Sequence, residues 1–368
     1  MLEKVFKLRE NGTDVKTEVI AGITTFMTMA YILAVNPSIM SAAGMDSGAV
    51  FTATALAALL GTVLMAVFAN YPFALAPGMG LNAYFAYTVV GVYGYSWKVA
   101  LTAVFAEGII FIILSATNVR EAIFNAIPKN LKAAVSVGIG LFIAFIGLQN
   151  AKIVIGGSTL LQLYSLDNYN AANGVKATFH DVGITVLLAI IGILITGILV
   201  IRNIKGNILW GILITWLLGI GCQFAGIYVP NPDVGFYSLL PDFSNGLSIP
   251  SIAPVFAKLD FHSMFSLNFI VVVFAFLFVD MFDTIGTLIG VSSKANMLDE
   301  DGKLPHIKGA LMADAVATTA GAVLGTSTTT TFVESASGVT EGGRTGLTAV
   351  TTAILFGLSL FLSPIFLA

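Results

Sequence analysis

Charged residues and cysteine are both scarce in this 368-residue chain. Only 10% of its residues are Asp, Glu, Lys or Arg, whereas a soluble domain carries about 25%. Cys222 is the only cysteine, so an intrachain disulfide is excluded, and its expected role is that of a small buried apolar residue. The net charge of -3 and the lack of a Lys/Arg-rich run give no support for a nucleic-acid partner.

Long hydrophobic runs are what the chain has instead. Hydrophobic residues make up 57% of the sequence, and the mean hydropathy is +0.92. These values predict an all-α polytopic membrane protein. About 20 apolar residues cross a hydrocarbon core of about 30 Å, and eleven segments fit that length. They are 18–40, 50–69, 73–91, 97–117, 131–150, 182–201, 207–228, 265–290, 309–324, 326–341 and 345–367.

The positive charges predict the orientation of these spans. If the N-terminus is cytoplasmic, thirteen Lys and Arg fall on the inside and four on the outside. This bias obeys the positive-inside rule. It predicts a multi-pass protein of the cell membrane with a cytoplasmic N-terminus. The inside set is Lys4, Lys7, Arg9, Lys16, Arg120, Lys129, Lys132, Arg202, Lys205, Lys294, Lys303, Lys308 and Arg344.

The third and tenth spans are interrupted. Pro77, Gly78 and Gly80 break the third, and the β-branched run Thr326–Thr331 favours an extended backbone in the tenth. Each is expected to be a short strand followed by a half-helix. Irregular backbone at membrane depth is tolerated only where protein or a cavity satisfies it, and paired interruptions mark binding sites in transporters. Ordinary Gly/Pro kinks are the alternative.

Acidic side chains accompany these breaks. Asp280 and Asp283 lie in the eighth span and Glu334 in the tenth. An aspartate at the bilayer centre costs roughly 2.5–3.5 kcal/mol on translocon scales, so such acids usually face a cavity on a substrate or proton path. Burial disfavours the charged form. At least one of the three is therefore expected to hold a proton at neutral pH, which predicts proton-coupled uptake.

Other polar residues are weaker candidates. Glu107 and Asp314 also lie at membrane depth, but neither belongs to an interrupted span. The histidines lie in or beside loops without a second ligand at helical spacing, so neither a metal site nor a cofactor is expected. The three histidines are His180, His262 and His306.

The order of the spans suggests an internal repeat. The first span stands two spans ahead of the Pro/Gly break, and the eighth stands two spans ahead of the Thr break. Seven spans separate the partners in each pair. An odd number reverses the membrane orientation, so the repeats are expected to be inverted, the usual basis of alternating access.

Four segments closely resemble the AzgA-like guanine/hypoxanthine permeases, members of the nucleobase/cation symporters in the xanthine/uracil permease superfamily. The resemblance runs from the N-terminal stretch to the last residue. The four segments are Ala21-Gly-Ile-Thr-Thr-Phe-Met-Thr-Met-Ala-Tyr-Ile-Leu-Ala-Val-Asn-Pro37, Ala76-Pro-Gly-Met-Gly-Leu-Asn-Ala-Tyr-Phe-Ala-Tyr87, Val279-Asp-Met-Phe-Asp-Thr-Ile-Gly-Thr-Leu288 and Thr326-Ser-Thr-Thr-Thr-Thr-Phe-Val-Glu-Ser-Ala-Ser-Gly338.

The resemblance implies a transporter rather than an enzyme, with a uracil-permease-like fold of two inverted repeats of seven spans and an elevator-type mechanism. Short strands are expected in spans 3 and 10. Residues 1–122 and 263–368 would form the core domain, from spans 1–4 and 8–11. Residues 123–262 would form the gate domain, from spans 5–7. Eleven of fourteen spans are present and gate spans 12–14 are absent, so the chain is expected to be a C-terminally truncated permease.

The resemblance also assigns residues to the purine. Asn82, Asp280 and Glu334 match purine-binding positions, and Asp283 is expected to serve coupling or structure. Thr330 and Phe332 of the tenth span are also predicted to bind the substrate. Glu334 is expected on the Watson–Crick edge and Asp280 on the imidazole side. A 6-oxopurine presents N1–H to a carboxylate, whereas adenine presents an acceptor there. The aromatic candidates for stacking on the base are Tyr84, Phe85 and Phe332.

Other function classes fit less well. An anion transporter of the sulfate type would favour a cation in the cavity, and an ion channel would not require paired breaks. An intramembrane aspartyl enzyme needs its aspartates on facing helices, whereas Asp280 and Asp283 share one helix. The predicted partners are a purine nucleobase, the proton and the lipid bilayer. The sequence does not distinguish guanine from hypoxanthine as the substrate or the proton from sodium as the coupled ion. A homodimer is one alternative for the oligomeric state.

Overall fold

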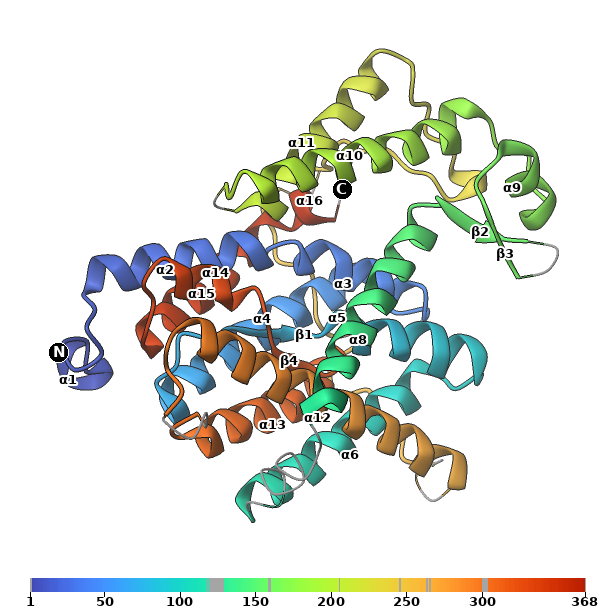
Figure 1. Cartoon of the computed structure of the whole chain (residues 1–368). Coiled ribbons are helices and arrows are strands. Elements are labelled where there is room, and N and C mark those ends of the chain that lie inside the picture. The colour runs from blue at the N-terminus through green and yellow to red at the C-terminus, as the bar shows by residue number, and fades with distance from the viewer. Residues whose placement is uncertain are drawn as a thin grey trace. The chain divides into compact units, whose positions relative to one another are not determined.

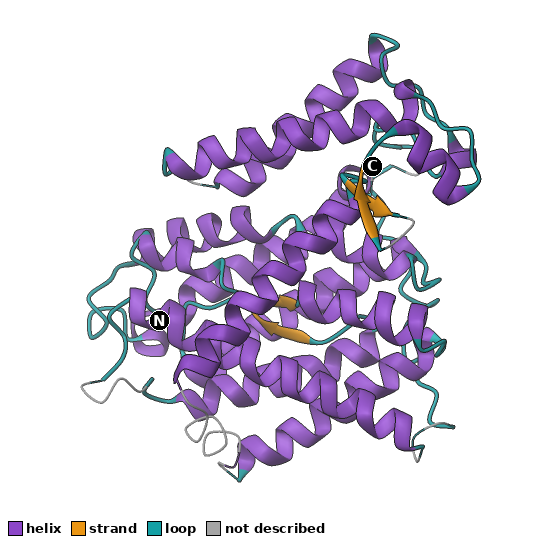
Figure 2. Ribbon diagram, turned by 45° about the vertical axis from the view of Figure 1, so that its right-hand side comes forward, coloured by secondary structure: helices purple, strands orange, loops and turns teal. Residues whose placement is uncertain are grey.

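The computed structural model of the chain consists mainly of helices, with two short pairs of strands (Figures 1 and 2). It describes residues 2–117, 119, 129–157, 160–204, 206–244, 246–262, 264, 266–299 and 304–367. Two compact units are present. The first is formed by residues 1–139 and 245–367, and the second by residues 140–244. Helix α8 (Lys129–Asn150) runs through the boundary between them.

The first unit contains most of the long helices. Its elements are α1 (Leu2–Phe6), α2 (Val15–Met29), α3 (Ile32–Ser41), α4 (Ser47–Ala69), β1 (Leu75–Pro77), α5 (Met79–Ala83), the π-helix η1 (Tyr84–Val92), α6 (Trp97–Ala116), α12 (Leu267–Lys294), α13 (Ile307–Leu324), β4 (Thr329–Thr331), α14 (Ser335–Thr340), α15 (Gly346–Ser359), the 3₁₀-helix η4 (Leu360–Leu362) and α16 (Ser363–Phe366).

Side-chain caps set where several of these helices begin. The first backbone N–H groups of a helix have no partner within it, and an Asp or Ser oxygen at the preceding position accepts from them. Asp14 accepts from Thr17 at the start of α2, and Asp46 caps α4 in the same way. Ser96 and Ser266 do so for α6 and α12.

The two interrupted segments meet as an antiparallel pair of strands inside the first unit (Figure 2, orange). Ala76 of β1 lies opposite Thr330 of β4. Two flanking backbone bonds extend the pairing, Gly78 N–H to the Thr328 carbonyl at 3.0 Å and Phe332 N–H to the Ala74 carbonyl at 2.9 Å. The pairing satisfies backbone groups that would otherwise be stranded at membrane depth.

The hydroxyl run 326–331 joins β4 to five helices of the same unit. Successive residues alternate in direction along a strand, so their partners lie on different sides. Each residue from 326 to 330 makes a hydrogen bond to one of these helices, through its side chain or, for Thr329, through its backbone carbonyl. The pairs are Thr326 with Asn36 of α3, Ser327 with Asn82 of α5, Thr328 with Glu107 of α6, the Thr329 carbonyl with Thr318 of α13, and Thr330 with Thr284 of α12.

Glycines let helices of this unit approach closely. A Cβ on Gly108 of α6 would lie 2.8 Å from the Thr319 backbone nitrogen of α13, and one on Gly309 would lie 2.3 Å from the Phe68 carbonyl of α4. A Cβ on Gly22 of α2 would meet the Thr348 carbonyl of α15 at 2.7 Å. Small residues at helix crossings are typical of membrane bundles, where close backbone packing replaces the hydrophobic effect.

The second unit contains two long helices, α10 and α11, that pack against each other, and several shorter elements. Its elements are β2 (Val154–Gly156), β3 (Leu161–Leu163), α9 (Leu166–Asn173), the π-helix η2 (Phe179–Gly183), α10 (Ile184–Ile201), α11 (Asn207–Phe224) and the 3₁₀-helix η3 (Pro232–Val234). Gly192 and Gly211 lie against Thr215 and Thr196 where α10 crosses α11. The β2–β3 hairpin and α9 lie between the fifth and sixth expected spans, where the sequence predicted no helix or strand.

The predicted fold class is confirmed, with differences at the ends of elements. Eight described helical segments are long and apolar enough to span a membrane. The third and tenth expected spans are the strand-plus-half-helix segments, and the fifth is α8. The half-helix after β1 begins at Met79. Eleven crossings and the core and gate assignments remain predictions. Arg120, Lys205, Lys303 and the 122/123 boundary lie outside the described residues.

Candidate functional site

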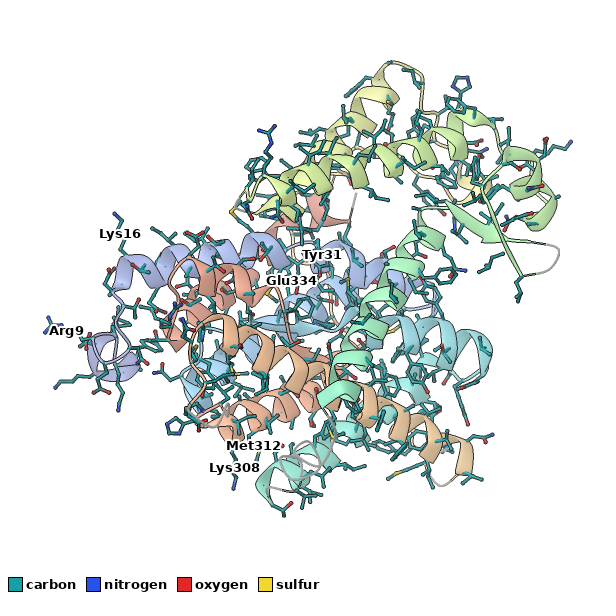
Figure 3. All side chains as sticks on the ribbon, viewed as in Figure 1. Arg9, Lys16, Tyr31, Lys308, Met312 and Glu334 are labelled. Atoms are coloured by element: carbon teal, nitrogen blue, oxygen red, sulfur yellow. The ribbon has the colours of Figure 1, made fainter. Side chains whose placement is uncertain are left out.

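A short hydrogen bond joins Tyr31 to Glu334. The Tyr31 hydroxyl donates to Glu334 Oε1 at 2.6 Å. Tyr31 lies between α2 and α3 and is 8% exposed, while Glu334 occupies the N-cap position of α14 and is half-buried. Figure 3 shows the two labelled side chains side by side near the middle of the first unit. A phenol and a carboxylate are thus fixed at the start of the tenth-span half-helix.

Close contact between α14 and α2 fixes this arrangement. A Cβ on Gly338 would lie 2.1 Å from Thr25 Oγ1 and 2.6 Å from the Ala21 carbonyl, so only glycine allows this approach. Thr28 Oγ1 also lies 3.4 Å from the Glu334 carbonyl oxygen. The half-helix that carries Glu334 therefore lies directly on α2.

Asp283 of α12 lies beside the same pair. Its carboxylate is half-buried and interacts electrostatically with Asp314, with Glu334 and with Tyr31. Its Oδ2 lies 3.6 Å from the point where a Cβ on Gly78 would be, at the end of β1. The structure thus brings together residues of both interrupted spans, of α12 and of the α2–α3 junction.

Asp280 has different surroundings. It is fully buried, and its Oδ1 lies 3.1 Å from the Thr284 hydroxyl. The same hydroxyl lies 2.9 Å from Asp314 Oδ1 and 2.7 Å from Thr330 Oγ1. Two aspartates and two threonines from α12, α13 and β4 therefore form one buried polar cluster, the Thr284 cluster. The sequence had placed Asp280 and Thr330 at the purine and had ranked Asp314 low.

Asn82 is fully buried one turn into the third-span half-helix. Its Oδ1 accepts a hydrogen bond from the Ser327 hydroxyl, and its Nδ2 lies 3.4 Å from the Pro77 carbonyl. Next to it, the Thr328 hydroxyl donates to Glu107 Oε2 at 2.8 Å. Both contacts tie the approach to β4 to neighbouring helices.

The aromatic candidates lie in the packed interior. Phe85 is fully buried in a cluster of α4, α6 and α12 side chains, and Phe332 is 5% exposed. Tyr84 packs edge-on against Phe276 of α12, with ring centroids 4.9 Å apart. Stacking on a base by any of the three remains a prediction.

Glu18 is a buried acid that the sequence did not single out. It lies on α2, is fully buried, and its carboxylate accepts hydrogen bonds from Arg344 N–H at 2.8 Å and from the backbone and hydroxyl groups of Thr345 and Thr348. A carboxylate is stable in this place because it meets the free N–H groups at the start of α15. It positions the turn after the site-bearing half-helix.

No single-sequence signal marks Tyr31 or Glu18. Tyr31 lies within the first motif, but its partner is 303 positions away, and the partners of Glu18 are more than 320 positions away. Within the described ranges, no group of three or more His, Cys, Asp or Glu side chains has a geometry that would hold a metal ion.

Comparison with known proteins identifies the family. Residues 16–368 match the family of xanthine/uracil permeases, described as the permease family. The chain belongs to this permease family. A permease is a transporter rather than an enzyme, and its long apolar helices make it a multi-pass membrane protein.

Three curated relatives match almost the whole permease chain. Putative permease MJ0326 of Methanocaldococcus jannaschii is 50% identical over 365 residues, which cover 99% of this chain and 77% of that protein. Guanine/hypoxanthine permease PbuO of Bacillus subtilis is 45% identical, and the match covers 98% of this chain and 78% of that protein. Adenine permease AdeP of Escherichia coli is 43% identical, and the match covers 99% of this chain and 76% of that protein.

A solved structure supports the fold of the permease. The transmembrane domain of the cyanobacterial bicarbonate transporter BicA superposes with a TM-score of 0.62 and covers 95% of this chain and 86% of that one. The identity is 14%, so this likeness concerns the fold alone.

Proposed function

We propose that this permease imports 6-oxopurine nucleobases, guanine or hypoxanthine, by proton symport. The observation that carries the proposal is the convergence of Glu334, Asp283 and Tyr31 where the two interrupted spans meet. The names of the relatives support a nucleobase substrate, since PbuO is a guanine/hypoxanthine permease.

The chemistry of the two acids favours an oxopurine. An ionised carboxylate only accepts hydrogen bonds. Hypoxanthine and guanine offer N1–H on the Watson–Crick edge, and guanine adds its exocyclic amine. Glu334 begins the half-helix that follows β4, and Asp283 Oδ2 lies beside Gly78 at the end of β1, so we assign these two acids the contact with the base. Asp280, buried in the Thr284 cluster, is assigned to the proton instead.

Hydrogen-bond counting in the Thr284 cluster supports proton coupling. A threonine hydroxyl has one proton to donate, yet three oxygens lie within 3.1 Å of Thr284 Oγ1, those of Asp280, Asp314 and Thr330. Whichever oxygen accepts from Thr284, the other two must donate to it. Because at least one of them belongs to an aspartate, all three bonds form only when an aspartate is protonated.

The ties within the first unit support an elevator-type mechanism. The run 326–330 links β4 to five helices, so the candidate site and the Thr284 cluster belong to the same unit. We propose that this unit carries both ligands across the membrane together. The excess of Lys and Arg in the predicted inside segments supports a cytoplasmic N-terminus.

Adenine transport is the second candidate. AdeP, an adenine permease, is almost as similar to this chain as PbuO, at 43% against 45% identity. An anion substrate is less consistent with the site, because Glu334 and Asp283 would repel it at close range.

The test is uptake of radiolabelled hypoxanthine, guanine and adenine by a purine-uptake-deficient strain that expresses the permease from its full gene, at pH 5.5 and 7.5, with and without a protonophore. We expect acid-stimulated, protonophore-sensitive uptake of the oxopurines that is lost in Glu334→Gln. Glu10→Gln, a change to an exposed acid near the N-terminus, is the control. Absence of purine uptake despite confirmed membrane expression would refute the proposal.

A further inference from the structure

Tyr31 determines how Glu334 can bond to a ligand. The phenol hydroxyl is a donor at neutral pH, and it is directed at Oε1 of the carboxylate. The O···O distance of 2.6 Å is that of a short hydrogen bond between two oxygens. With Oε1 engaged by Tyr31, Oε2 is the Glu334 oxygen that accepts no side-chain hydrogen bond from another described residue.

The surroundings of Tyr31 and Glu334 stabilise the hydrogen bond between them. Tyr31 is 8% exposed, and α14 packs closely on α2 at Gly338, so the backbone positions of both partners are fixed relative to each other. Among the described residues, the Tyr31 hydroxyl is the side-chain group that donates a hydrogen bond to the Glu334 carboxylate. Tyr31 is therefore the side chain that fixes Glu334 as an acceptor.

We propose that Tyr31 is the residue that sets the purine class of this permease. By holding Glu334 in its acceptor form, Tyr31 selects bases that present N–H at position 1, the 6-oxopurines. It disfavours bases that present an acceptor nitrogen there, the 6-aminopurines. This inference rests on the proposed function, and it adds a selectivity role for a residue of the α2–α3 junction.

Removing the phenol hydroxyl changes what Glu334 can do. In Tyr31→Phe, the carboxyl group loses its donor and can take up a proton of its own. A protonated carboxyl group has one O–H and can donate to an acceptor nitrogen. The preference for hypoxanthine over adenine, measured as the ratio of kcat/KM values, is expected to fall about tenfold, the size expected for one hydrogen bond of about 1.4 kcal/mol.

The chain offers a matched control at Tyr71. This tyrosine is also buried in the first unit, at 6% exposure, and its hydroxyl has no hydrogen-bond partner among the described residues. Tyr71→Phe removes the same atom from a similar environment without touching Glu334. Its hypoxanthine-to-adenine ratio is expected to equal that of the wild type.

The experiment compares wild type, Tyr31→Phe and Tyr71→Phe in uptake of hypoxanthine and adenine and in competition by 1-methylhypoxanthine, which lacks N1–H. Tyr31→Phe should lower the hypoxanthine-to-adenine ratio and narrow the gap between hypoxanthine and its 1-methyl derivative. Should Tyr31→Phe fail to reach the membrane, Tyr31→Met, which also lacks a hydroxyl, takes its place.

The outcomes separate this inference from the function it rests on. Wild-type cells that take up no purine overturn the proposed function itself. Wild-type transport with an unchanged ratio in Tyr31→Phe, or with equal loss of both substrates, overturns the selectivity role and leaves the proposed function standing. A lower ratio confined to Tyr31→Phe supports the inference.

Discussion

Glu18 and Thr345 lie 327 positions apart, and Glu18 Oε2 accepts a hydrogen bond of 2.8 Å from the Thr345 hydroxyl. Thr345 is the N-cap of α15, so the carboxylate of one helix completes the cap of another. The same helix, α2, leads into Tyr31 at its other end. One element thus holds the site-bearing hairpin α14–α15 at two points.

Loss of Glu18 should therefore destabilise the whole first unit. Five donors reach its carboxylate, and hydrogen bonds to a charged group are worth about 1.5–3 kcal/mol each. We expect Glu18→Ala to lower the free energy of unfolding by at least about 3 kcal/mol in a denaturant titration in detergent. Glu10→Ala, at an exposed acid, should have no measurable effect.

Gly338→Ala should disturb the contact between α14 and α2. Its new methyl group would clash with the Ala21 carbonyl, which is backbone and cannot rotate away. Overpacking of this kind costs about 1–3 kcal/mol, so the variant should melt at a lower temperature and transport poorly. Gly290→Ala on α12 is the control, since nothing lies within 4 Å of its added Cβ. Equal melting temperatures for both variants would refute the contact.

The Thr284 cluster predicts a difference between two conservative changes. Thr284→Ser keeps the hydroxyl and should retain protonophore-sensitive accumulation of hypoxanthine. Thr284→Val has a similar shape without the hydroxyl, so it leaves two buried aspartates without their shared partner. We expect it to lose accumulation by at least tenfold, about 1.4 kcal/mol. Full accumulation in Thr284→Val would remove the cluster from the proton path.

The Glu107–Thr328 hydrogen bond should be measurable as a coupling energy. The residues are in contact on different elements, with an O···O distance of 2.8 Å. A double-mutant cycle with Glu107→Gln and Thr328→Val should give a coupling of about 0.5–3 kcal/mol in the free energy of unfolding. Additive single effects would show that the two side chains do not interact.

Asp14 should not contribute to the pH dependence of uptake. The Thr17 backbone N–H donates to its carboxylate, which holds the pKa of Asp14 below the usual 3.8. A group with a lowered folded-state pKa stabilises the protein above its unfolded pKa, and that stabilisation disappears only as the pH falls through the folded value. Asp14→Asn should therefore keep the wild-type ratio of uptake at pH 5.5 and 7.5, with a changed ratio as the contradicting result.

The sequence predicts the fold class well because its strongest signals are local. Long apolar runs predict the helices, and the Pro/Gly and Thr interruptions correctly predict β1 and β4. The β2–β3 hairpin escaped prediction because its strands are three residues each and lie in a polar loop.

The partners of each acid depend on tertiary structure and do not follow from spacing. Asp280 and Asp283 are three residues apart on one helix, yet Asp280 shares the Thr284 hydroxyl with Asp314, while Asp283 lies close enough to Asp314, Glu334 and Tyr31 to interact with their charges. Helical geometry brings positions i and i+3 onto adjacent parts of one surface. It does not say which neighbouring helix covers each part, and that requires the position of α13.

The bond between Asn82 and Ser327 has a consequence for synthesis of the protein. The two residues are 245 positions apart, and a ribosome that adds about 5–20 residues per second needs roughly 12–50 s to bridge that interval. During this time the first broken span has been made while the strand that completes it does not yet exist. The nascent chain must shelter unpaired backbone from lipid for tens of seconds, so late pairing of the two strands is expected to limit the rate of membrane assembly.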